Sequence, residues 1–188
     1  QLCQVKLNSE QTARLNQLSQ EHRATLYMTM LAAFGLLLSR YTGQEEIVTG
    51  SPIANRQEAR LEELIGFFVN TLVMRVRVKP EASFAELLGE VRRTALEAYE
   101  HQDVPFERLV EELSPERSLN TTPIFQVIFA LQNAPRVPER MPGLSLEPLD
   151  GQQLSVRCDL AVHAWEQHGE IGVSWLYNRN LFDAWRID

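Results

Sequence analysis

The chain has 188 residues, of which 44% are hydrophobic, and it carries a formal net charge of −7. This length and composition predict one well-cored domain over residues 1–188, which buries roughly 70% of the surface of the unfolded chain. Because lysines and arginines are scattered among the acidic residues and form no run, we expect no nucleic-acid partner.

A strand and two helices open the chain. Residues 2–7 alternate apolar and polar side chains, as a half-buried strand does, and Asn8 or Ser9 is then placed to cap a helix. The next helix begins after Thr25 and is apolar on nearly every face until Gly43 ends it. We expect that helix to pack against a sheet.

Two strands separated by a polar loop come next. Residues 46–53 contain β-branched side chains and predict a strand, whereas the charges of residues 54–63 suit an exposed loop. Residues 67–78 predict a longer strand with an apolar face at its even positions. Asn70 shares that face, where a buried amide without partners costs about 1 to 3 kcal/mol. It is either a structural amide bound to neighbouring backbone or a side chain that points into a polar channel.

Two helices occupy the middle of the chain. Ser83 and Glu86 form a capping box, and apolar side chains follow at helical spacing as far as Tyr99. Pro105 suits the first turn of a second, short helix, which Asp103 is placed to cap.

The last third of the chain is rich in strands. Residues 124–132 predict one strand, and residues 154–165 and 171–177 predict a hairpin. Between them lies a proline-rich excursion of residues 133–153, which a compact domain usually keeps for function or contact. The order of elements indicates an α/β (α+β) two-layer sandwich, with a mixed β-sheet flanked by helices.

The cysteines and the ends of the chain bear on its environment. Cys3 and Cys158 are too few and too far apart for a disulfide framework or a zinc cluster. Residues 26–38, the most apolar stretch, are about half the ~20 residues that span a bilayer. With no signal-peptide pattern, we expect a cytoplasmic protein with no membrane partner. Because the chain opens on Gln1 and stops at Asp188, just after a helix start, we expect a piece of a larger protein.

Two motifs resemble those of a known family. Residues 65–72 read I-G-F-F-V-N-T-L and are followed by Arg75, and residues 101–107 read H-Q-D-V-P-F-E. They resemble the I-G-x-F-V-N-T and H-Q-D-x-P-F-E motifs of the condensation domains of nonribosomal peptide synthetases. Residues 117–125, R-S-L-N-T-T-P-I-F, resemble a diverged form of the next motif, and residues 41–56 resemble the strand and loop before them.

The resemblance implies a V-shaped domain of two lobes, each folded like a chloramphenicol acetyltransferase subunit, with a channel between them. This chain would be the C-terminal lobe, with a floor loop at about residues 51–64 and a latch-like excursion at about residues 126–150. In the implied reaction, the amine of an acceptor aminoacyl thioester attacks a donor aminoacyl or peptidyl thioester and forms an amide. The implied partners are the N-terminal lobe, peptidyl carrier proteins and a neighbouring adenylation domain. The 4'-phosphopantetheine arms of the carriers would hold the substrates, and no cofactor would be bound directly.

The resemblance also assigns roles to individual residues. The positions expected to line the channel or position substrate are Asn70, Thr71, Ser51, Arg56 and Gln126. The motif positions expected to be structural are Gly66, Phe68, Arg75, His101, Gln102, Asp103, Pro105, Phe106, Glu107, Arg117, Asn120 and Pro123. No metal ligand and no catalytic residue is assigned to the chain.

The family's His-His-x-x-x-Asp-Gly motif, which carries the histidine implicated in amide formation, is not found in this sequence. We therefore expect the isolated lobe to be inactive. The alternative from a different class is a noncatalytic lobe of an inactive condensation-like domain that binds or docks carrier proteins. A third hypothesis, a self-sufficient acyltransferase acting through His101, predicts amide formation by this chain alone.

Other polar and aromatic residues keep two interpretations. His101 is a candidate general base because imidazole side chains serve in that role, but its segment also reads as a turn between helices. Arg75 and Arg77 are either a solvated strand face or a wall for an anionic pantetheine arm. The tryptophans are interpreted as packing residues, with a ligand cage as the alternative: Trp165, Trp175 and Trp185.

Overall fold

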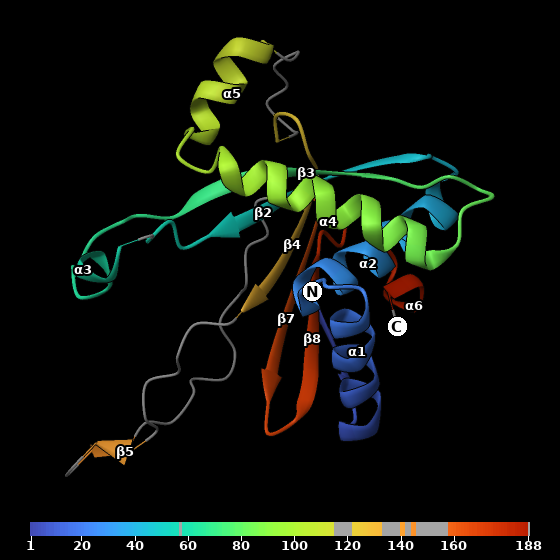
Figure 1. The fold of residues 1–188 in the computed structure, drawn as a ribbon, viewed down its shortest axis with the longest axis horizontal. Helices are drawn as coiled ribbons and strands as arrows, with labels where there is room; N and C mark the ends of the chain where they lie inside the picture. The colour runs from blue at the N-terminus through green and yellow to red at the C-terminus, as the bar shows by residue number, and fades with distance from the viewer. Residues whose placement is uncertain (57, 115–121, 133–139, 142–143, 146–157, 188) are drawn as a thin grey trace.

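The structure is a computed structural model that describes residues 1–56, 58–114, 122–132, 140–141, 144–145 and 158–187 (Figure 1). The elements are, in chain order, β1 (Leu2–Leu7), α1 (Ser9–Glu21), α2 (Leu26–Thr42), β2 (Glu46–Ile53), α3 (Ala59–Glu62), β3 (Asn70–Arg77), α4 (Phe84–Glu100), α5 (Phe106–Leu113), β4 (Val127–Gln132), β5 (Arg140–Met141), β6 (Leu144–Ser145), β7 (Leu160–Gln167), β8 (Glu170–Tyr177) and α6 (Ala184–Ile187).

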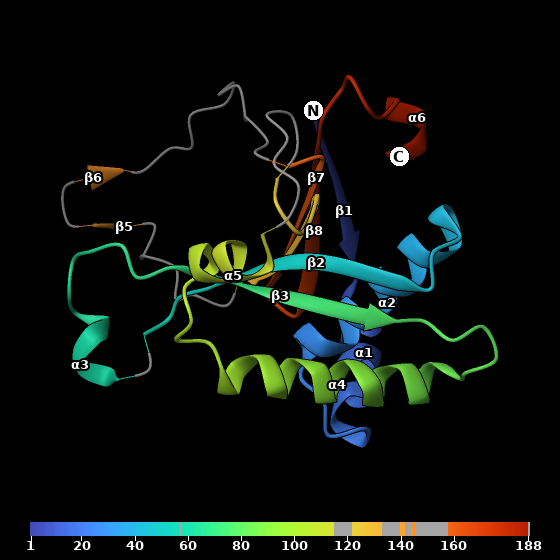
Figure 2. The same ribbon diagram turned by 90° about the horizontal axis from the view of Figure 1, so that it is seen from above.

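A six-stranded mixed sheet in the order β1-β8-β7-β4-β2-β3 organises these elements. Strand β4 runs parallel to both β2 and β7, and the other neighbouring pairs are antiparallel. The buried residues of alternate strand positions form one continuous core with α2 and α4, and α1 packs on α2 and β8. Figure 2 shows α4 running alongside β3. The predicted mixed sheet with a helical layer is confirmed.

Local sequence signals set the helix ends where they were predicted. Asn8, Thr25 and Ser83 are N-caps whose side chains each accept a hydrogen bond from a backbone N–H in the first turn. Gly43 ends α2 in the left-handed conformation, with φ of 71°. None of the helices in the described part of the chain is long and apolar enough to cross a membrane.

Strand β3 begins at Asn70, three residues later than the strand predicted for residues 67–78. The reason is its partner: β2 ends at Ile53, which pairs with Asn70 in the last rung of the ladder. Beyond that rung Phe67 leaves the sheet and is 90% exposed. Within β3 the alternation is as predicted, because Leu72, Met74 and Val76 are buried and Arg75 and Arg77 are exposed.

Two further expectations were wrong in detail. The loop predicted for residues 54–63 contains a single helical turn, α3. The short helix α5 has Pro105 as its N-cap, two residues after the expected cap Asp103, and Pro105 supplies no side-chain cap. A proline has no backbone N–H and no hydrogen-bonding side chain, so the first N–H of α5 is satisfied from elsewhere in the fold.

The predicted C-terminal hairpin forms between β7 and β8. Its turn lies at His168 and Gly169, both with positive φ, as a two-residue hairpin turn requires. Most of the excursion predicted for residues 133–153, and of the latch predicted for residues 126–150, lies outside the described residues. The described parts of these segments are β4 and the small β5–β6 pair.

The three tryptophans do not form a cage. Trp175 packs edge-on against Phe34 in the core, with ring centroids 5.7 Å apart. Trp165 lies on the opposite face of the sheet, over Gly172, where an added Cβ would lie 2.3 Å from its ring. Trp185 is 71% exposed. The packing interpretation therefore holds for the two strand tryptophans.

His163, on β7, gives the fold an expected pH dependence. Burial lowers the pKa of its imidazole below the ordinary value. The unfolded chain therefore takes up a proton at His163 at a higher pH than the folded chain does. As the pH falls below about 6.5, this proton uptake favours the unfolded chain and lowers the free energy of unfolding. We expect urea unfolding midpoints of the wild type and of His163→Gln to diverge between pH 8 and pH 5, with the wild type losing more stability. Parallel curves over this range would contradict the assignment.

Candidate functional site

Asn70 joins two segments that lie far apart in the sequence. Its side-chain Nδ2 donates hydrogen bonds to the backbone carbonyl oxygens of Gln102 and Val104, each at 2.8 Å. Its Oδ1 accepts from the backbone N–H groups of Thr71, at 2.8 Å, and of Phe106, at 3.1 Å. The amide is only 9% exposed, and these four bonds account for its two donors and both lone pairs.

One of these bonds caps α5. Phe106 is the first residue of that helix, and its N–H has no partner within the helix. Asn70 supplies the acceptor that Pro105 lacks, so a residue on β3 acts as a long-range N-cap. The backbone bonds of Asn70 are those expected of a structural amide. That it also lines a channel stays a prediction.

Aromatic packing extends this junction to a third motif segment. The ring of Phe106 packs against Phe125, with centroids 5.3 Å apart. Phe125 in turn lies on Gly50 of β2, where an added Cβ would come within 2.3 Å of its ring. The glycine is needed for this approach. The segments around residues 50, 70, 106 and 125 therefore meet in one place.

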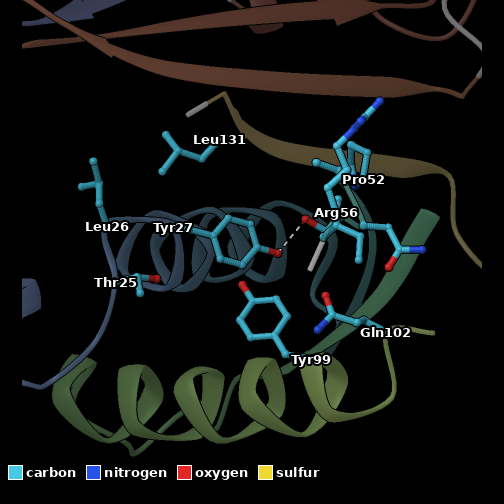
Figure 3. Close-up of a pocket in the computed structure, with 12 residues that line it drawn as sticks. Thr25, Leu26, Tyr27, Pro52, Arg56, Tyr99, Gln102 and Leu131 are labelled. Atoms are coloured by element: carbon cyan, nitrogen blue, oxygen red, sulfur yellow. Dashed lines mark hydrogen bonds between the residues drawn. The ribbon is translucent and has the colours of Figure 1, made fainter. Parts of the chain in front are cut away.

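A cavity of about 500 Å³ adjoins this junction. It is walled by the start of α2, the end of β2 with the residues that follow it, the end of α4, and the end of β4 (Figure 3). Asn70 binds the backbone carbonyl oxygen of Gln102, and the side chain of Gln102 lies at the wall of the cavity. Of the residues predicted to line a channel, Ser51 and Arg56 are on the wall as well.

A chain of hydroxyl groups crosses the wall. The Tyr27 hydroxyl donates to Ser51 Oγ at 2.7 Å, and Ser51 Oγ donates to the carbonyl oxygen of Phe129 at 2.9 Å. Burial raises the pKa of Tyr27 well above its ordinary value, a shift that the hydrogen bond with Ser51 partly opposes. Burial also raises the pKa of Tyr99, whose hydroxyl points toward Tyr27 in Figure 3. Both phenols therefore stay neutral near pH 7. The Tyr27 oxygen, whose proton is given to Ser51, can accept a hydrogen bond from a ligand, and the Tyr99 hydroxyl can donate one.

Arg56 is bound by the loop that follows β2. Its guanidinium donates to the carbonyl oxygen of Leu61 and, at 3.5 Å, to that of Gly66. It also lies over the ring of Phe68, 4.2 Å from the centroid. Gly66 and Phe68, predicted to be structural motif positions, thus share a contact with a residue predicted to line the channel.

The remaining predicted positions lie around the cavity or away from it. Thr71 is half-buried, and Gln126 Nε2 donates to the Thr122 carbonyl oxygen at 2.8 Å; neither is on the cavity wall. Arg75 forms an ion pair with Glu46, with Nε and Oε1 2.7 Å apart, and half of its side chain is exposed. The hydrogen bond from Arg75 is the main reason that the pKa of Glu46 is lowered. The solvated-face interpretation fits this position.

The H-Q-D-V-P-F-E segment is a turn followed by a helix. His101 is the C-cap of α4, and its side chain is exposed. Asp103 and Glu107 are exposed as well, and Glu107 lies in the first turn of α5. Pro123 is half-buried beside the segment that leads to β4. The predicted positions Arg117 and Asn120 lie outside the described residues.

The phenols of the cavity were not predicted from the sequence. Tyr99 is on the helix face that the periodicity marks as apolar, and Tyr27 is in a helix that is apolar on nearly every face, so neither was assigned to a site. The available signal was chemical, because a tyrosine on an apolar face needs a partner for its hydroxyl. Which partner it finds depends on how α2 is set against β2, and periodicity does not specify that.

Comparison with known proteins places this geometry in a family. The family model described as "Condensation domain" matches residues 2–188. The chain belongs to the condensation domain family. One of the linear gramicidin synthase proteins of Brevibacillus parabrevis is 48% identical to it over 186 residues, which are 98% of this chain and 2% of that protein. The chain therefore spans only a small part of that curated relative.

Solved structures share the fold. A holo four-domain nonribosomal peptide synthetase bound to AMP and glycine superposes with a TM-score of 0.88 at 22% identity, covering 98% of this chain and 15% of that one. The X-domain in its complex with OxyB, from teicoplanin biosynthesis, gives a TM-score of 0.85 at 27% identity, covering 98% and 41%. The predicted condensation-domain fold is confirmed.

Proposed function

We propose that this condensation-domain chain is the C-terminal lobe of a domain that forms amide bonds in nonribosomal peptide synthesis. In the reaction, the amine nitrogen of an acceptor attacks the thioester carbonyl of a donor. The carbon–nitrogen bond forms, the carbon–sulfur bond breaks, the amine loses a proton and the sulfur gains one, so the donor's carrier is left with a free thiol. The role of this chain is to position the two substrates, which can supply much of the rate.

The observation that carries the proposal is the cavity beside the motif junction. Its wall includes Ser51 near the end of β2 and Arg56 shortly after that strand. Gln102 of the H-Q-D-V-P-F-E segment is on the wall as well. Neutral phenols and an amide suit the amide groups of a phosphopantetheine arm, which present both donors and acceptors. The identity of 48% to a linear gramicidin synthase protein supports the same reaction class.

The proposed partners follow from that role. Peptidyl carrier proteins would present the donor and the acceptor on 4'-phosphopantetheine arms. A neighbouring adenylation domain would load the amino acid onto its carrier protein. The N-terminal lobe of the domain would form the opposite wall and hold the His-His-x-x-x-Asp-Gly motif. The chain would then bind no cofactor of its own and would be inactive without that lobe.

The Tyr27 hydroxyl tests the role of the cavity. In the full-length protein we expect Tyr27→Phe to lower the rate of amide formation about tenfold, because the wall loses an acceptor oxygen and Ser51 loses the hydrogen bond that orients it. Stability should fall by only about 1 kcal/mol, since Ser51 keeps its bond to Phe129. The measurement is product formation from loaded carrier proteins, followed by mass spectrometry, with thermal unfolding alongside.

Tyr41→Phe is the matched control, because Tyr41 is 76% exposed and is not on the wall of the cavity. Its rate should equal that of the wild type. A Tyr27→Phe protein that is folded and fully active would contradict the role of the cavity.

A second candidate function is a docking lobe without condensation activity. The observation that favours it is the similarity to an X-domain solved in a complex with OxyB. On this hypothesis the full-length protein binds its partner protein but forms no amide, and its N-terminal lobe carries a degraded histidine motif. An intact His-His-x-x-x-Asp-Gly sequence in that lobe, together with amide formation, would rule this out.

A further inference from the structure

The connection between β2 and β3 is long for two strands that pair directly. The ladder ends at the Ile53–Asn70 rung, and residues 54–69 connect the two strands outside the sheet. Among the described residues of the connection, the backbone hydrogen bonds are local. The Leu61 N–H donates to the backbone carbonyl oxygen of Glu58 at 2.8 Å, and the Leu64 N–H donates to that of Leu61 at 3.3 Å. Closing and ordering such a loop costs conformational entropy that local turns do not offset.

One side chain crosses the connection. Arg56, near its start, donates to the Leu61 carbonyl oxygen in the middle and to the Gly66 carbonyl oxygen near its end. The same guanidinium stacks on Phe68, two residues before the sheet resumes. A planar guanidinium can form a forked hydrogen bond and a cation–π contact at once, whereas a lysine ammonium is a single point charge.

The residues around these contacts suit a closed loop. An added Cβ on Gly66 would lie 2.9 Å from the Phe68 ring, so the glycine leaves room for that ring. Phe68 is half-buried against Arg56, while two nearby apolar residues, Ile65 and Phe67, are 103% and 90% exposed. The closed loop therefore turns one aromatic ring inward and two large apolar side chains outward.

We propose that Arg56 is a positioning residue that holds residues 54–69 closed from inside. It thereby fixes the segment after β2 that lines the cavity and the outward direction of Ile65 and Phe67. This role is structural, and it does not depend on the reaction that the protein catalyses. Its consequence for amide formation rests on the proposed function and is measured separately.

Hydrogen–deuterium exchange of the full-length protein tests the closed loop. We expect Arg56→Ala to speed exchange of the backbone amides of residues 58–69 about tenfold or more, while the amides of Leu72 and Met74 in β3 keep their protection. Cleavage by a glutamate-specific protease at Glu58, Glu62 and Glu63 should rise in parallel. That protease is chosen because the substitution removes a trypsin site.

Arg60→Gln is the matched control. Arg60 is another arginine of the same connection, with 79% of its side chain exposed and an ion pair to Glu58. Its exchange should stay within about twofold of the wild type, because an exposed ion pair contributes little. Equal exchange in Arg56→Ala and Arg60→Gln would overturn the proposal, as would a loss of protection that extends to β3.

Two further variants test the mechanism of closure. Arg56→Lys keeps a cation and one donor, so its loop should exchange at a rate between those of the wild type and Arg56→Ala. Phe68→Leu removes the ring on which Arg56 stacks. Its effect should be non-additive with Arg56→Ala, because the two side chains act as one unit. A lysine variant identical to the alanine variant, or strict additivity, would overturn the closure mechanism.

The rate of amide formation separates this inference from the proposed function. We expect Arg56→Ala to raise the KM for the loaded carrier protein more than it changes kcat, since a misplaced wall weakens binding. If the loop opens in exchange and amide formation is unchanged, Arg56 keeps its role in the fold and the assignment of the loop to the working channel fails.

Discussion

Replacing Asn70 with alanine is expected to destabilise the fold by about 3 kcal/mol, because four partly buried backbone groups lose their partner. The backbone carbonyl oxygens of Gln102 and Val104 and the N–H groups of Thr71 and Phe106 all bind this one side chain. The start of α5 should fray, since its long-range cap is gone. Amide formation by the full-length protein should fall at least tenfold, because Gln102 leaves its place on the cavity wall.

Asn70→Asp distinguishes the loss of the two Nδ2 hydrogen bonds from the loss of side-chain volume. The carboxylate has nearly the shape of the amide, but it places a second acceptor against two carbonyl oxygens. We expect this variant to be at least as unstable as Asn70→Ala at pH 7 in urea unfolding. Asn180→Ala, at an exposed position, is the control and should unfold like the wild type. Wild-type stability in Asn70→Asp would contradict the donor role of Asn70.

Phe129→Ala is expected to lower the free energy of unfolding by about 3 to 5 kcal/mol. Phe129 is 2% exposed and stacks on Phe34, with centroids 5.4 Å apart. It also packs against Tyr27 at 5.8 Å. The cavity left behind should therefore loosen the hydroxyl chain as well as the core, and activity should fall more than in Tyr27→Phe.

Phe67→Ala is the matched substitution at a position that is 90% exposed. Its unfolding free energy should lie within about 0.5 kcal/mol of the wild type. The comparison is made by urea unfolding at pH 7, with circular dichroism to verify the native state of each variant before denaturation. Equal losses in the two variants would contradict the assignment of Phe129 to the core.

Much of the fold follows from local signals in the sequence. Asn8, Thr25, Ser83 and Gly43 each mark a helix end that the structure places at that residue. The alternation along β3 assigns Leu72 and Met74 to the core, as found. These signals act over a few residues, so they do not depend on how the elements are arranged in space.

The features of the fold that were not predicted depend on contacts between residues that are distant in the sequence. The start of β3 is set by the end of β2 at Ile53, and the cap of α5 comes from Asn70 across the fold. Tyr27 contacts Ser51 only because α2 and β2 are neighbours in the folded chain. The motif resemblance identified the family, and two of the five residues that it expects to line a channel, Ser51 and Arg56, are on the cavity wall. It did not indicate that Asn70, Phe106 and Phe125 form one junction.

A single-turnover assay tests whether this chain contributes to amide formation. The full-length protein is mixed with one carrier protein loaded with a donor aminoacyl thioester and a second loaded with an acceptor. We expect the donor acyl group to appear in amide linkage on the acceptor carrier, and its transfer to slow in the Tyr27→Phe and Asn70→Ala proteins. Carrier proteins that bind the folded, full-length protein but exchange no acyl group would contradict the proposed function and favour the docking lobe.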